Sequence, residues 1–450
     1  MMLKPSLWTI GFFYFGSISC TYDISNPTPV YVVQGGEAVL QCAFESRSLT
    51  WRVYNVGSVL IVASDNVTTD NSKYSTSKNP AGLYYRLYIK NVGVADLKKY
   101  KCQGKANAIP KQFYFQLELL VPPSRVSIEN VASPSRLLGT EGHDLTVSCK
   151  AVGGTPAPYV VLIIDGQTVA NQTRSVQHTL NSARSYDKKT VTCQASNPAN
   201  SQKSLTDSAV IYLNLKPLTP TITRYTGSIE VTKPLDVTCT TTGSRPKATL
   251  QWTIGQKDVT SDATEQSSHN TETDMYTVMS DLTYSVGKSD NGQMLTCKAI
   301  NVAASSGVLT SITLNVTYAP TVTVTDTTYD QNKAIRTVAC IPDGNPKSYT
   351  YDKWQHKSKY GVLIRELDGG TNGVLTLPNI TVDNRYQDSG EYVCSAGNGI
   401  VGSNGNVEQT GSGDVIINAR PIFTNDNSLT QYGEFGKNVD INVYVYSIPI

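Results

Sequence analysis

The sequence contains few of the residues that catalytic and metal chemistry most often use. Its 450 residues include four histidines. They lack the Gly-x-Ser-x-Gly, Gly-x-x-x-x-Gly-Lys-Ser/Thr and His-Glu-x-x-His motifs, and no paired Cys-x-x-Cys is present. We therefore predict that the protein is not an enzyme, with no catalytic residue, cofactor, metal site or small-molecule substrate.

The sequence also lacks an excess of charge of either sign. Lys and Arg number 38 against 36 Asp and Glu, which gives a net charge of +2. A chain without surplus positive charge is not expected to bind nucleic acid. The hydrophobic fraction is 39%, enough for several small cores, and 26 Tyr against 8 Phe are typical of half-exposed β-sheets.

Long apolar runs are scarce as well. Residues 7–15 form an apolar run that is too short to span a bilayer, but it follows Lys4 and precedes the small residues Gly16 and Ser17. This layout predicts a secretory signal peptide over residues 1–20. The mature chain is therefore expected to be extracellular, either secreted as given or the ectodomain of a plasma-membrane protein whose anchor lies beyond Ile450.

In an oxidising compartment, cysteines are expected to form disulfides. Apart from Cys20 in the predicted signal peptide, there are eight: Cys42, Cys102, Cys149, Cys193, Cys239, Cys297, Cys340 and Cys394. Taken in order as pairs, they lie 60, 44, 58 and 54 positions apart. The spacing predicts a repeat of about 100 residues, but eight cysteines allow 105 connectivities, so spacing alone leaves the pairing open.

The residues around the cysteines predict strands with one buried face. Apolar residues alternate before the first cysteine of each pair, as in Leu40-x-Cys42 and Val237-x-Cys239. Trp51, Trp252 and Trp354 follow the first cysteine of pairs one, three and four, while Leu162 takes that place in the second. Pairs one and four end in Asp-x-x-x-Tyr-x-Cys, with Tyr100 and Tyr392 two residues before the cysteine.

Cysteine pairs at this spacing, with Trp between them and Tyr-x-Cys at the end, resemble the immunoglobulin superfamily. Repeats two and three resemble the C2-type domains of nephrin-like and nectin-like adhesion receptors, although Val191 and Leu295 stand where Tyr is usual. Repeat four, with Gly344-Asn-Pro346, resembles the I-set domains of hemicentin-like proteins.

The resemblance implies an all-β fold of tandem immunoglobulin-like β-sandwiches, four complete and one partial at the C-terminus. It implies the disulfides Cys42–Cys102, Cys149–Cys193, Cys239–Cys297 and Cys340–Cys394. The expected domains after the signal peptide are residues 21–121, 122–216 (C2-type), 217–318 (C2-type) and 319–420 (I-set or C2-like). Residues 421–450, with Val443 in the place of a cysteine, are expected to be part of a fifth domain, either a truncated sequence or a natural tail.

Surface features complete the sequence-based expectations. Four sequons predict N-glycosylation at Asn66, Asn171, Asn315 and Asn379. In the first repeat, alternation places Trp51, Tyr100, Cys102 and Phe115 inward. It directs the following residues outward on one sheet: Arg52, Tyr54, Lys101, Gln103, Lys105, Tyr114 and Gln116. Tyr and Arg are common in binding hot spots, and the resemblance implies that the distal domain binds partners through this face.

These expectations define a function. We predict a cell-surface adhesion or recognition protein whose distal domains bind other cell-surface or extracellular proteins, in a homophilic or heterophilic manner. The alternative is a secreted immune-type recognition protein that binds foreign or microbial surfaces.

Overall fold

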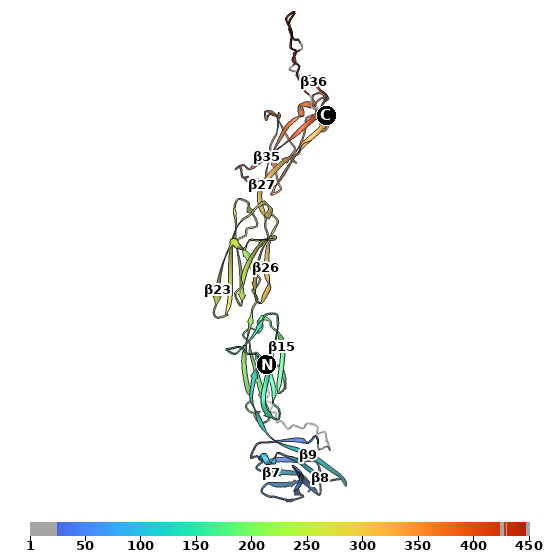
Figure 1. Ribbon diagram of the computed structural model, residues 1–450, viewed down its shortest axis with the longest axis vertical. Helices are drawn as coiled ribbons and strands as arrows, with labels where there is room; N and C mark the ends of the chain where they lie inside the picture. The colour runs from blue at the N-terminus through green and yellow to red at the C-terminus, as the bar shows by residue number, and fades with distance from the viewer. Residues whose placement is uncertain (1–24, 424–426, 429, 447–450) are drawn as a thin grey trace, which may run out of the picture. The chain divides into compact units, whose positions relative to one another are not determined.

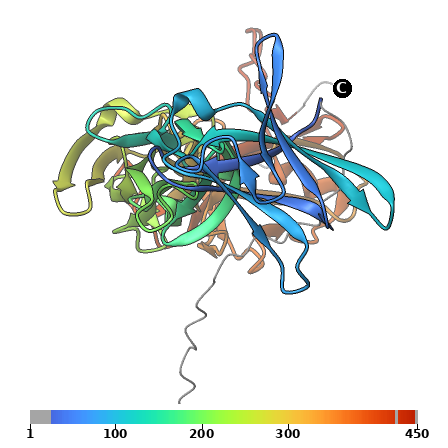
Figure 2. The same ribbon diagram turned by 90° about the horizontal axis from the view of Figure 1, so that it is seen from below.

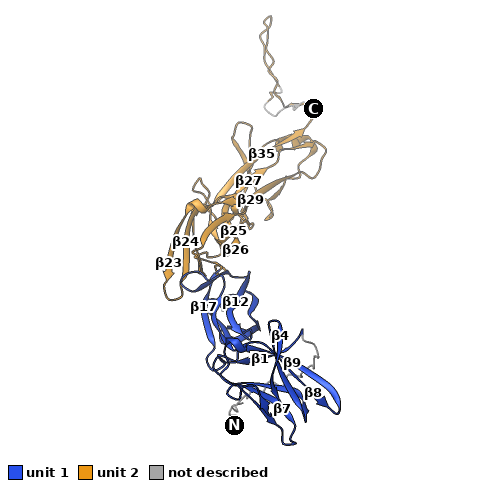
Figure 3. Cartoon of the chain, turned by 60° about the horizontal axis from the view of Figure 1, so that its bottom comes forward, with its two compact units in different colours: residues 1–215 blue, residues 216–450 orange. Residues whose placement is uncertain are grey.

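The computed structural model describes residues 25–423, 427–428 and 430–446, so the predicted signal peptide lies outside the described residues. Strands and the turns between them make up almost all of this part, together with short 3-10 helices (Figure 1). The chain divides into two compact units, with the division in sequence between Leu215 and Lys216 (Figure 3). Each unit contains two β-sandwiches, so the prediction of tandem immunoglobulin-like sandwiches is confirmed.

The first sandwich packs a six-stranded sheet against a three-stranded one, and Figure 2 brings it to the front, in blue to cyan. The larger sheet has the order β1 (Thr28–Val32), β9 (Ile109–Leu119), β8 (Lys99–Ala106), β3 (Leu49–Asn55), β4 (Ser58–Ser64) and β5 (Val67–Thr68). The smaller sheet has the order β2 (Ala38–Ser46), β7 (Tyr84–Ile89) and β6 (Tyr74–Lys78). β1 pairs with β9 in parallel. The 3-10 helix η1 (Val94–Asp96) lies between β7 and β8.

The second sandwich completes the first unit. Its three-stranded sheet consists of β10 (Val121–Ile128), β12 (Asp144–Thr155) and β15 (Ser175–Asn181). Its five-stranded sheet has the order β11 (Arg136–Thr140), β17 (Leu205–Asn214), β16 (Thr190–Ser196), β13 (Tyr159–Ile164) and β14 (Gln167–Thr173), with η2 (Arg184–Tyr186) before β16. Leu162 is fully buried and lies opposite Cys193, in the position that Trp occupies in the other sandwiches.

The third sandwich opens the second unit with two four-stranded sheets. One has the order β18 (Thr221–Thr223), β20 (Pro234–Ser244), β24 (Met275–Ser285) and β23 (Ala263–Asn270). The other has the order β22 (Lys257–Asp258), β21 (Thr249–Ile254), β25 (Met294–Asn301) and β26 (Ala304–Thr313). The short helices η3 (Thr260–Asp262) and η4 (Lys288–Asp290) precede β23 and β25.

The fourth sandwich shares a strand with the third. Its first sheet comprises β27 (Val316–Val324), β29 (Thr337–Asn345) and β33 (Val374–Thr376), and β19 (Ile229–Glu230) of the third sandwich pairs with β27 at the edge of this sheet. Its second sheet has the order β28 (Thr327–Asp330), β35 (Glu408–Asn418), β34 (Gly390–Gly397), β31 (Trp354–Lys357) and β32 (Leu363–Leu367), and β30 (Thr350–Tyr351) also pairs with β34. The 3-10 helix η5 (Val382–Asp388) precedes β34. β27 pairs in parallel with β19 at its start and antiparallel with β29 further on.

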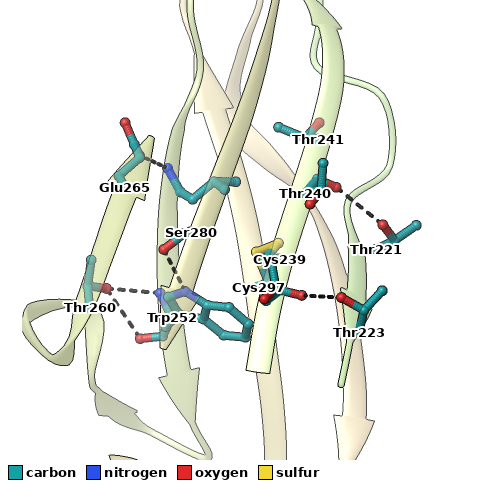
Figure 4. Close-up of a disulfide and its surroundings, with 12 residues drawn as sticks. Thr221, Thr223, Cys239, Thr240, Thr241, Trp252, Thr260, Glu265, Ser280 and Cys297 are labelled. Atoms are coloured by element: carbon teal, nitrogen blue, oxygen red, sulfur yellow. Dashed lines mark hydrogen bonds between the residues drawn. A yellow bond between two sulfur atoms is a disulfide. The ribbon is translucent and has the colours of Figure 1, made fainter. Parts of the chain in front are cut away.

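Four disulfides join the facing sheets: Cys42–Cys102, Cys149–Cys193, Cys239–Cys297 and Cys340–Cys394. Figure 4 shows the third, with the indole of Trp252 next to it. Trp252 is fully buried, lies opposite Cys297 and donates a hydrogen bond from Nε1 to Ser280 Oγ at 3.0 Å. Trp51 and Trp354 are equally buried in the first and fourth sandwiches. The first, third and fourth cores therefore each combine a disulfide with a buried Trp.

The Tyr-x-Cys motifs form the expected tyrosine corners. The hydroxyl of Tyr100 donates to the carbonyl of Asp96 at 3.1 Å, and that of Tyr392 donates to the carbonyl of Asp388 at 2.9 Å. Both tyrosines are buried, so each corner gives a phenol in the core a hydrogen-bond partner. Burial raises the pKa of Tyr392 to about 12, with nearby Asp388 acting in the same direction, which keeps the phenol protonated as a donor.

The domain boundaries stay predictions. Strand β27 runs through the boundary expected between residues 318 and 319, because its two halves pair with different sandwiches. After the fourth sandwich, β36 (Ile422–Phe423) pairs with β37 (Val445–Tyr446), while residues 424–426, 429 and 447–450 lie outside the described residues. A partial fifth domain over residues 421–450 also stays a prediction.

Candidate protein-binding face

The predicted binding residues come together on the larger sheet of the first sandwich. Arg52 on β3 lies opposite Lys101 on β8, which in turn lies opposite Tyr114 on β9. The other predicted residues, Tyr54, Gln103, Lys105 and Gln116, alternate with buried positions on the same three strands. We call these seven residues the β3–β8–β9 face.

Buried side chains on the same strands fix the outward orientation of these seven residues. Trp51, Tyr100, Cys102 and Phe115, all at most 3% exposed, point from the same strands into the sandwich. The Trp51 and Phe115 rings lie 5.8 Å apart, and Trp51 is directly opposite Cys102. Since side chains alternate along a strand, burying this set holds the intervening residues outward.

Tyr114 differs from the expectation of an exposed side chain. It is only 7% exposed, although it lies on the outward side of β9. The Tyr54 ring lies 6.1 Å from its ring, and Lys101 Nζ lies 5.8 Å from its centre. The side chains of Tyr54 and Lys101 therefore cover Tyr114, which leaves little of its surface for a partner to contact.

Arg52 has a polar atom that its surroundings do not satisfy. Its Nε is buried, and no hydrogen-bond partner for that atom exists among the described residues. A buried donor without an acceptor costs about 1–3 kcal/mol. Such groups are uncommon in folded proteins.

An apolar stripe that the sequence analysis did not single out borders the face. Val59 and Ile61 on β4 are 47% and 48% exposed. Val59 lies opposite Tyr54, and Ile61 lies opposite Arg52. Beyond Ile61, Asn66 occupies the turn between β4 and β5, at the edge of the same sheet. Alternation along β3 could not reveal this stripe, because β4 follows a turn and its pairing register was not known.

A hollow of about 1210 Å³ opens at the end of the face where β2, β3 and β8 meet the loops. Its lining includes Arg47, Arg52 and Lys105, and Glu45 is its one acidic residue. Gln103 and Thr50 contribute further polar groups. The hollow is therefore polar and mainly basic.

The predicted glycosylation sites lie on the surface. Asn66, Asn171, Asn315 and Asn379 are all exposed. Asn171 Oδ1 accepts a hydrogen bond from Tyr159, and Asn315 Oδ1 accepts one from Asn345 at 2.8 Å. Both bonds use the oxygen and leave the amide nitrogen, the atom that would carry a glycan, outside these contacts. Glycosylation itself stays a prediction.

The fourth sandwich contains the densest cluster of buried charge. Asp388 is fully buried and accepts hydrogen bonds from Arg336 Nη2 at 2.7 Å and Arg365 Nη2 at 2.5 Å. Arg365 Nε also donates to His356 Nδ1 at 3.2 Å, which leaves the His356 Nε2 hydrogen to the carbonyl of Ser389 at 3.1 Å. These groups satisfy one another, so the cluster supports the fold and is not a reactive site. No group of three or more His, Cys, Asp or Glu in the described ranges could hold a metal ion.

This cluster predicts acid sensitivity of the fourth sandwich. Burial lowers the pKa of His356, and Arg365 acts in the same direction. The unfolded state therefore binds more protons as the pH falls below the ordinary histidine pKa of about 6.5. Stability contributed by neutral His356 is complete above that pH and is lost as the pH falls toward the folded-state pKa.

We expect the urea concentration at which the fourth sandwich unfolds to be lower at about pH 5.5 than at about pH 7.5, as measured by hydrogen exchange in β34. His356→Gln should reduce the shift, whereas His143→Gln, at an exposed position of the second sandwich, should leave it unchanged. An equal shift in all three proteins would rule out His356 as its source.

The sandwich topology, the disulfides and the tyrosine corners define a protein built from tandem immunoglobulin-like domains. Residues 218–306, within the third sandwich, match the model of the CD80-like C2-set immunoglobulin domain. The resemblance to the immunoglobulin superfamily that the sequence predicts is thereby confirmed.

Particular relatives extend this similarity. Nephrin from Homo sapiens is 24% identical over 387 residues, which cover 81% of this chain and 30% of nephrin. Hemicentin-1 from Mus musculus is 26% identical over 333 residues, 70% of this chain and 5% of hemicentin-1. Cell adhesion molecule 4 from Homo sapiens is 27% identical over 171 residues, 36% of this chain and 40% of that protein. The chain thus spans less than half the length of each of these relatives.

Proposed function

We propose that this chain is an extracellular adhesion or recognition protein that binds another protein through the β3–β8–β9 face. The observation that carries the proposal is a sheet surface that combines the half-buried Tyr54, basic side chains and the exposed β4 stripe. Exposed apolar patches beside polar groups are typical of protein-binding surfaces.

The relatives support the same conclusion. Their names include cell adhesion molecules, and the similarity to nephrin covers 81% of this chain. Secretion through the predicted signal peptide would place the face outside the cell. None of the helices in the described ranges has the length and apolar character needed to cross a membrane.

The proposal predicts binding that depends on multivalent display. A single face of this size is expected to bind weakly, while several copies on one scaffold bind through avidity. We expect the full chain, displayed as a multimer, to bind at least one protein in a panel of cell-surface ectodomains. Uniform background across the panel and against a second copy of the chain would contradict the proposal.

A further inference from the structure

The near-neutral charge of the whole chain conceals a basic first sandwich. Residues 25–121 contain eleven Lys and Arg against six Asp and Glu, a net charge of +5, whereas the whole sequence carries +2. The imbalance is concentrated in the sheet that bears the face. Strands β3, β8 and β9 carry five basic residues against the single acid Glu118.

The basic groups in the hollow lack counter-ions of their own. Within the described ranges, no ion pair joins Arg47, Arg52 or Lys105 to an acid, in contrast to Lys73, which lies 2.6 Å from Asp96 elsewhere in this sandwich. A carboxylate in the hollow would supply the missing negative charge, and Arg binds carboxylates with two parallel hydrogen bonds.

The apolar stripe decides which kind of anion fits. Ile61 lies opposite Arg52, so any ligand over Arg52 also covers the stripe. A sulfated polysaccharide has no apolar surface to bury Val59 and Ile61, which are 47% and 48% exposed. A protein segment in which acidic residues alternate with apolar ones complements both features.

Charge also argues against docking of two identical faces. A two-fold symmetric contact places the same patch of each copy against the other. Two first sandwiches that each carry +5 would then repel one another, and like charges across an interface suppress association. The face therefore fits a partner with a different, acidic surface.

We propose that the hollow lined by Arg47, Arg52 and Lys105 is a docking site for a carboxylate-bearing segment of a different protein, with the β4 stripe receiving its apolar residues. This inference rests on the proposed function and specifies the partner chemistry. Binding at the site is consequently heterophilic and weakens as salt screens the charges.

Peptides on beads test the site directly. The probe is a peptide in which Glu alternates with Leu and Tyr, and the comparator carries Gln in place of Glu. At physiological salt we expect the multimeric full chain to bind the Glu peptide on the order of tenfold more than the Gln peptide. Arg52→Gln with Lys105→Gln should abolish the difference.

The matched control removes the same charge away from the site. Lys78→Gln with Lys90→Gln changes exposed lysines at the end of β6 and just after β7 and should preserve binding. Equal binding to both peptides, or loss in both double variants, would overturn the inference. So would retention on heparin beads that requires Arg52 and Lys105 while the Glu peptide stays at background.

The two proposals fail in different ways. A partner found in the ectodomain panel whose binding ignores Arg52→Gln with Lys105→Gln would overturn the acidic docking site and leave the adhesion function standing. Specific capture of the Glu peptide without any partner in the panel would support the docking site and contradict adhesion through the panel proteins.

Discussion

Replacing Cys239 and Cys297 together with alanine is expected to unfold the third sandwich at ordinary temperature. Their disulfide closes 58 positions of chain, and losing it relaxes the unfolded state by about 4 kcal/mol on the chain-entropy model. That is a large share of the stability of a small domain, which is roughly 5–15 kcal/mol. Trp252 packs next to the bridge, so its packing is lost at the same time (Figure 4).

Hydrogen exchange of the full chain measures this result. Amides of β20 and β25 should lose their protection, while those of β3 and β8 in the other unit keep theirs. Thr240→Ala with Lys298→Ala, adjacent to the two cysteines, should cost no more than about 1 kcal/mol. Native-like protection of β20 and β25 in the disulfide variant would show that apolar packing alone maintains the sandwich.

Replacing Asp388 with alanine is expected to destabilise the fourth sandwich to a similar degree. Arg336 and Asp388 are both fully buried, and Arg336 donates two hydrogen bonds to the carboxylate. Removing one partner of a buried ion pair costs about 3–5 kcal/mol, because the remaining charge is uncompensated. Arg365 would lose its partner as well.

Urea unfolding followed by hydrogen exchange in β34 and β35 provides the measurement. Asp414→Ala is the matched control, since Asp414 is an exposed acid on β35 of the same sheet, and it should change stability by about 0.5 kcal/mol at most. If the Asp388→Ala protein were as stable as the control, the hydrogen bonds from the Arg336 guanidinium to backbone carbonyls would be enough to hold the cluster without the carboxylate.

Much of the fold could be predicted from the sequence, because its strongest signals are local. Alternation before Cys42 and Cys239 marks the strands, and Tyr-x-Cys marks the corners that Tyr100 and Tyr392 form. Local signals could not predict that strand β27 belongs to two sandwiches, because only its pairing in three dimensions shows this.

The candidate site could be predicted in part. Alternation assigned the seven residues to one side of one sheet, and the register of β3, β8 and β9 places them there, while their role in binding stays a prediction. The burial of Tyr114 depends on how Tyr54 and Lys101 fold over it, and the unsatisfied Nε of Arg52 depends on the whole neighbourhood. These features arise from side-chain packing across strands, which spacing along one strand does not encode. The net charge of the whole chain also hid the basic first sandwich, because the sum includes the acidic third and fourth sandwiches.

The central claim is that the β3–β8–β9 face binds the partner, and an introduced glycan tests it most directly. Gln103→Asn with Lys105→Thr creates a sequon around Gly104 at exposed positions of the face, while Gln41→Asn with Ala43→Thr creates one at exposed positions of the opposite sheet. Both variants are secreted from mammalian cells, checked for glycan occupancy by mass and tested as multimers on the ectodomain panel. We predict that the first glycan abolishes partner binding and the second preserves it. Full binding by a fully occupied first variant would contradict the account.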